Sequence, residues 1–101
     1  MDYFTTDQNG ITLVDPGKQE RIRLLESVLS DHRADFPEVY LTNSSGLVIG
    51  YRSDGCLLWE ESGGVSRYLR NADLQMAISV WDLLIDNDRD QLDSLDWMTI
   101  E

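Results

Sequence analysis

The clearest hydrophobic pattern lies in the last third of the chain. Six apolar residues there recur with the spacing of one face of an α-helix: Leu74, Ala77, Ile78, Trp81, Leu84 and Ile85. The pattern predicts a helix over about residues 72–85 that buries this face. Asn71 and Asp73 both precede the stripe, and either residue type suits the N-cap position.

A second apolar stripe predicts another amphipathic helix closer to the N-terminus. It consists of Ile22, Leu25, Val28 and Leu29. Asp15 is expected as the N-cap and Pro16 as the first helical residue, because a proline there loses no hydrogen bond. The helix should therefore cover about residues 15–30. Residues 1–10 are polar, and we expect them to be loose.

Between the two predicted helices, the hydrophobic period changes to that of β-strands. Glycine- and serine-containing turns separate four apolar runs, at residues 39–42, 47–51, 56–60 and 65–69. Short strands are also expected at residues 11–14 and 95–100. The predicted fold class is α+β, with residues 1–101 as one domain. A single antiparallel β-sheet, formed by the meander and the C-terminal strand, is packed by two helices.

The net charge of this chain is unusually negative for a small domain. Its 19 acidic and 8 basic residues give a formal net charge of −11 over 101 residues. Such a field attracts basic surfaces and repels nucleic acids and anionic membranes, so we expect a protein partner and neither of the other two. No secretory signal pattern and no apolar run near ~20 residues is present, which favours a cytoplasmic location.

Carboxylates concentrate directly after the second predicted helix, at Asp86, Asp88, Asp90 and Asp93. The exposed carbonyl groups at a helix C-terminus disfavour anions, so folding alone gives little reason for so many acids in one loop. We therefore take these four residues, with Glu60 and Glu61, as candidate contacts with a basic partner. The alternative is a solvated loop that only keeps the protein soluble, with the interface on the meander strands or near Glu60 and Glu61.

The same segment begins like a calcium-binding loop, but the later positions do not fit one. Gln91 stands where the sharp turn needs glycine, and Trp97 stands where a bidentate glutamate belongs. We expect no specific calcium site. The chain has one histidine, His32, and one cysteine, Cys56, which cannot supply the usual zinc ligand sets. No metal or other cofactor is therefore expected.

Residues able to carry out chemistry do not form a recognisable catalytic set. His32 follows the first predicted helix, where we expect it to cap helix carbonyl groups, and Cys56 lies in an apolar run and should be buried. Residues 62–64 read Ser-Gly-Gly and lack the lysine of a phosphate loop, so they predict a hairpin turn. The tryptophans, Trp59, Trp81 and Trp97, are assigned mainly to the core. We expect no enzymatic activity.

Three stretches resemble immunity protein family one of bacterial polymorphic toxin systems. They are the helix at residues 15–29, the hairpin at residues 47–51 and 54–59, and the closing helix and strand at residues 77–84 and 95–97. In the hairpin, Asp54-Gly55 leads into Cys56-Leu57-Leu58-Trp59. The resemblance covers about residues 15–100. Residues 90–94 lack the proline that the family often carries before its late tryptophan.

The resemblance implies a small cytoplasmic α+β protein that binds and inhibits a toxin encoded beside it. No catalytic residues are carried over, because immunity proteins act by blocking, and interface residues vary with the toxin. Combined with the charge, it predicts a basic toxin partner, such as a nuclease or nucleic-acid deaminase. The alternative is an acidic adaptor or structural subunit that binds a protein of its own cell.

Overall fold

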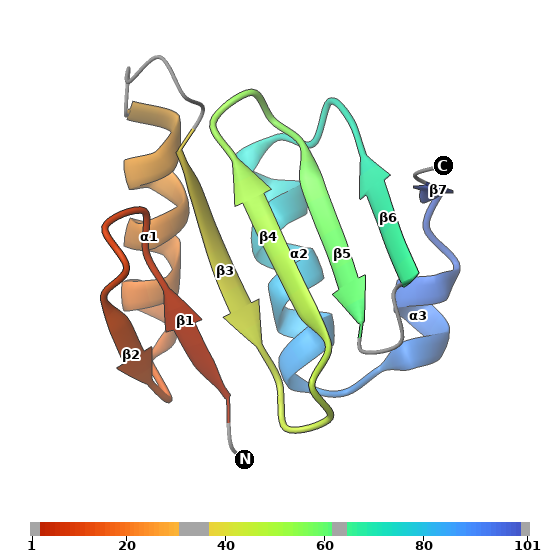
Figure 1. Cartoon of the computed structure of the whole chain (residues 1–101), viewed down its shortest axis with the longest axis horizontal. Coiled ribbons are helices and arrows are strands. Elements are labelled where there is room, and N and C mark those ends of the chain that lie inside the picture. Colours follow the sequence, from red (N-terminus) through yellow and green to blue (C-terminus); the bar gives the residue numbers. More distant parts are fainter. Residues whose placement is uncertain (1–2, 31–36, 62–64, 100–101) are drawn as a thin grey trace.

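The computed structural model describes residues 3–30, 37–61 and 65–99 and contains one antiparallel sheet with helices (Figure 1). The described elements, in chain order, are β1 (Phe4–Thr6), β2 (Thr12–Val14), α1 (Lys18–Ser30), β3 (Glu38–Thr42), β4 (Val48–Arg52), β5 (Leu57–Glu61), β6 (Val65–Leu69), α2 (Leu74–Ile85), α3 (Arg89–Asp93) and β7 (Met98–Thr99). The strand order is β2-β1-β3-β4-β5-β6-β7, and every neighbouring pair is antiparallel. The α+β class and the single antiparallel sheet are confirmed.

Helices α1 and α2 pack on the same face of the sheet, behind the strands in the view of Figure 1. The core lies between these layers. Its fully buried strand residues alternate along β3, β4 and β5, and they are Val39, Leu41, Ile49, Tyr51, Leu57 and Trp59. From the helices, Leu25 and Val28 of α1 and Ala77, Trp81 and Leu84 of α2 meet them. No described helix covers the other face, which we call the open face.

Helix α2 is held to the sheet by polar contacts as well as by its apolar stripe. The Trp81 indole is 1% exposed, and its Nε1–H donates to the Ile49 carbonyl over 3.0 Å. The Tyr51 hydroxyl donates to the Ala72 carbonyl over 2.8 Å, which fixes the approach to the helix. Asp73 is the N-cap, since its Oδ1 accepts from the Met76 N–H over 2.8 Å. The assignment of Trp81 to the core is confirmed.

The N-terminal expectations need two corrections. Residues 3–10 are not loose, because β1 pairs with both β2 and β3 inside the sheet and Thr5 is buried. Asp15 does not cap α1: it has a positive φ of 48°, and its Oδ1 accepts from the Tyr3 N–H at 3.2 Å. Helix α1 begins at Lys18 instead, with the Gly17 carbonyl accepting from the Arg21 N–H. The contact with Tyr3 outweighs the local preference of Asp15 for capping.

Other boundaries also differ from the sequence expectation. The acidic segment contains a short helix, α3, so the described residues hold three helices where two were predicted. The closing strand is shorter than residues 95–100, because Trp97 precedes β7. Leu29 was placed on the buried stripe of α1 but is 38% exposed. The remaining strands agree with their predicted positions to within about one residue.

Candidate functional site

The predicted acidic residues meet mainly at one corner of the molecule, where α2 ends and α3 begins. We call residues 86–93 together with Glu61 the acidic corner. Asp86 is the C-cap of α2, and Asn87 turns the chain with a positive φ of 55°. Asp88 then caps α3, its Oδ1 accepting from the Gln91 N–H at 3.2 Å. The expectation of an irregular loop is therefore wrong, because these turns start a new helix.

Several of the carboxylates have a role in folding that the sequence did not reveal. Asp88 satisfies a free N–H of α3, and Asp90 lies in the first turn of this helix, where the dipole favours a negative charge. Asp86 lies at the C-terminus of α2 and Asp93 in the last turn of α3, the ends that disfavour a negative charge, and Asp93 is paired there with Arg67 and Arg89. The argument that folding gives little reason for these acids therefore holds for Asp86 and fails for Asp88.

Two arginines join the acidic corner to the sheet. Arg89 Nη2 lies 2.8 Å from Glu61 Oε1, and Arg89 Nε lies 3.4 Å from Asp93 Oδ2. Arg67 of β6 lies 3.2 Å from the other oxygen of Asp93. These charge-assisted contacts link α3 to β5 and β6.

Trp59 forms the apolar centre of this ion-pair network. Its ring lies 4.8 Å from the Arg67 guanidinium carbon and 4.9 Å from that of Arg89, so both cations interact with the π-system. Trp97 meets the same ring edge-on at 5.2 Å. The Trp59 Nε1–H donates to Glu61 Oε1 over 3.0 Å. The sequence did not point to this cluster, although the i, i+4 spacing of Arg89 and Asp93 was a local signal.

The structure brings five of the six predicted partner-binding residues together: Asp86, Asp88, Asp90, Asp93 and Glu61. Glu60 points to the open face instead, because neighbouring strand residues alternate between faces. Within the described part of the chain, the side chains of Asp86, Asp90 and Glu60 form no hydrogen bond or ion pair, and all three are exposed. The acidic corner thus presents Asp86 and Asp90 as exposed carboxylates that no described side chain pairs with.

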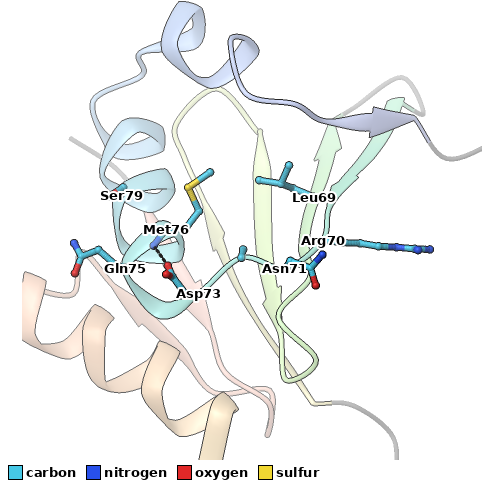
Figure 2. Close-up of a pocket in the computed structure, with 8 residues that line it drawn as sticks. Leu69, Arg70, Asn71, Asp73, Gln75, Met76 and Ser79 are labelled. Carbon is cyan, nitrogen blue, oxygen red and sulfur yellow. Dashed lines mark hydrogen bonds between the residues drawn. The ribbon is translucent and has the colours of Figure 1, made fainter.

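A groove opens at the opposite end of α2, between this helix and β6, with a volume of about 500 Å³. Figure 2 shows Leu69 and Met76 on its two sides, while the Arg70 side chain extends away from it. The carboxylate of Asp73 is bound to the Met76 N–H as the helix cap. The groove lies one helix length, ~18 Å, from the acidic corner.

A charged group at the edge of the open face shows the effect of burial. The Glu38 carboxyl has a raised pKa, chiefly because the carboxyl is partly buried, and Glu60 and Asp54 add to the effect against the opposing influence of Arg52. Arg52 donates to both oxygens of Asp54, at 2.9 and 2.7 Å, and this hydrogen bonding lowers the pKa of Asp54. Arg52 therefore favours the charged form of Asp54 more than that of Glu38.

The other candidate residues have simple positions where the structure describes them. Cys56 is buried, as expected, and burial raises the pKa of its thiol. His32 and the expected turn at residues 62–64 lie outside the described residues. Across residues 3–30, 37–61 and 65–99, histidine, cysteine and carboxylate side chains form no group of three that could hold a metal ion.

Comparison with known proteins adds no relative. No family model, curated protein or solved structure matches the chain. None of the helices in the described residues is long and apolar enough to cross a membrane.

Proposed function

We propose that this chain is a cytoplasmic immunity protein that binds and inhibits a cognate bacterial toxin by covering its active or substrate-binding surface. The observation that carries the proposal is the acidic corner, where Asp86 and Asp90 are exposed and form no ion pair with a described residue, and where ion pairs join α3 to the sheet. A nuclease or a nucleic-acid deaminase suits this corner as the target, because enzymes that hold phosphates present basic surfaces.

Two physical properties support this assignment. The net charge of −11 steers the protein toward a basic surface and raises the association rate. The contacts of Arg67 and Arg89 hold α3 in place before binding, so less conformational entropy is lost when the carboxylates meet cations of the partner. Steering alone gives little affinity, which requires a desolvated contact at the centre of the interface.

The test is co-expression with the product of the adjacent gene, followed by co-purification and a growth-protection assay. Asp90→Lys should slow association by roughly threefold or more, since it reverses a charge at the proposed contact. Glu26→Lys is the matched control: Glu26 is also exposed on a helix, and the net charge changes equally. It should slow association less.

Two results would count against the proposal. Equal binding and protection by Asp90→Lys and wild type would place the interface elsewhere. An adjacent gene product that has no toxic activity, yet co-purifies with the chain, would favour the acidic adaptor or structural subunit.

A further inference from the structure

Exposed apolar side chains gather at the β2 edge of the sheet, far from the acidic corner. Val14 is 77% exposed and Ile11 is 58% exposed. Leu13 and, on the adjoining β1, Phe4 are also exposed. Strand β2 is the last strand on this side of the sheet (Figure 1). No other described strand pairs with the outer side of β2. A hydrophobic edge strand of this kind is unusual, because it invites pairing with another chain.

The backbone of β2 is available for such pairing. The Ile11 carbonyl accepts from the Asp7 N–H, and the Asp15 N–H donates to the Tyr3 carbonyl, both over 2.9 Å. Alternate residues of an antiparallel strand point to opposite sides, so the N–H and C=O groups of Thr12 and Val14 are directed away from β1. These two residues can therefore exchange hydrogen bonds with an added strand.

A groove of about 310 Å³ lies beside this edge, between β2 and α1. Leu13 and Leu24 form its apolar surface, and Glu20 and Arg23 also line it. Side chains of an added strand would alternate in direction, so every second one would lie over this groove. The arrangement combines backbone pairing with a site for side chains, as strand addition requires.

Local charge identifies the chemistry of the added strand. Asp7 and Asp15 flank β2, and Glu20 lines the groove. Arg23 is the one cation among the residues that line the groove in the described part of the chain. A basic strand is therefore favoured. A second copy of this chain is disfavoured, because each copy carries a net charge of −11.

We propose that the β2 edge is a second binding surface, which takes an extended segment of alternating apolar and basic residues as an added strand. Its backbone pairs with Thr12 and Val14, and its apolar side chains lie beside Val14 and Phe4 on the open face. The alternate side chains lie over the groove between β2 and α1. Basic side chains lie near Glu20. This inference does not depend on the toxin proposal, because it concerns another surface and another type of contact.

The probe is a capped heptapeptide of alternating Lys and Val, titrated into the full-length protein by calorimetry and amide hydrogen exchange. Binding should protect the amides of Thr12 and Val14. Val14→Pro removes an outward N–H at an edge position that tolerates proline, and it should weaken binding about fivefold or more. Val14→Thr keeps that N–H and should change affinity by less than about twofold.

A second pair of variants tests the charge of the groove. Glu20→Lys should weaken peptide binding more than Glu26→Lys, although both change the net charge equally. No binding of the peptide, or equal binding by wild type and Val14→Pro, would overturn the proposal. A heptapeptide of alternating Glu and Val that binds as tightly as the Lys and Val peptide would also overturn the proposal. Self-association of the protein that Val14→Pro abolishes would show that a second copy occupies the edge.

Discussion

The buried indoles stabilise the fold in different ways. Trp81 lies between α2 and the sheet and donates to Ile49 of β4. Trp59 is also fully buried, but its ring contacts two guanidinium groups, those of Arg67 and Arg89. One tryptophan therefore joins the two layers of the core, and the other joins the core to the acidic corner.

Removal of Trp81 should be strongly destabilising. Trp81→Ala leaves a large cavity and removes the hydrogen bond from the indole to the Ile49 carbonyl. It should lower the free energy of unfolding by about 3–5 kcal/mol. Chemical denaturation measures this loss. Trp97→Ala is the comparison, since Trp97 is only partly buried, and it should cost less. A Trp81→Ala protein that unfolds like wild type yet loses its partner would place this side chain at an interface.

The raised pKa of Glu38 predicts that replacement of this residue stabilises the protein in a pH-dependent way. Its folded pKa lies above the ordinary value of 4.5, chiefly through burial, so the folded state takes up this proton more readily than the unfolded state. Charged Glu38 therefore opposes folding above the raised pKa, and this cost disappears as pH falls toward 4.5. Glu38→Gln should raise Tm at pH 7, and the gain should shrink near pH 4.5.

Differential scanning fluorimetry at the two pH values provides the measurement for Glu38. Glu26→Gln is the control, because Glu26 is exposed on α1 and its replacement should change Tm little at either pH. A lower Tm for Glu38→Gln at pH 7 would mean that the attraction between Glu38 and Arg52 outweighs the burial of the carboxyl.

Helix α3 shows how one cap can decide the structure of a whole segment. Its five residues make it too short to be stable alone, so it depends on Asp88 and on the contacts of Arg89 and Asp93. Replacement of Asp86, Asp88, Asp90 and Asp93 by asparagine should therefore disturb the ion pairs of Asp93 with Arg67 and Arg89. The sequence alone did not indicate these ion pairs.

Two alanine variants distinguish the role of an aspartate at the start of α3 from that of an aspartate at the end of α2. Asp88→Ala removes the cap of α3 and should cost about 1 kcal/mol. Asp86→Ala removes a negative charge from the C-terminus of α2 and should be neutral or slightly stabilising. Urea denaturation measures both. Equal losses in the two variants would contradict the assignment of Asp88 as the functional cap.

On the scale of the whole molecule, charge is expected to control association more than dissociation. The association rate with a basic partner should fall steeply as salt is raised from ~0.01 M to ~0.15 M, because screening shortens the Debye length from about 30 to about 8 Å. Dissociation should change less, since it depends on the short-range contacts. Stopped-flow measurements across this range provide the test, and a salt-independent association rate would remove the steering argument.

The sequence indicated the group of carboxylates at residues 86–93, and their role as partner contacts stays a prediction. The carboxylates of residues 86–93 are close together in space because they are close in sequence. Arg67 was not identified, because β6 reaches Asp93 only through folding. Glu60 and Glu61 were treated as one pair, although the alternation of β5 sends them to opposite faces. The exposed edge at β2 was not anticipated either, because exposure depends on which strand lies beside it.

The sequence by itself determined the positions of α1, α2 and the meander strands, because the apolar period that encodes them lies within each segment. Tertiary structure decided the rest. It placed β1 between β2 and β3 and joined α3 to the sheet through Arg89. It also made Asp15 accept a hydrogen bond from the Tyr3 N–H, so that Asp15 does not cap α1. Each outcome depends on a residue that is distant in sequence. A local sequence pattern cannot predict how much such a contact stabilises the fold.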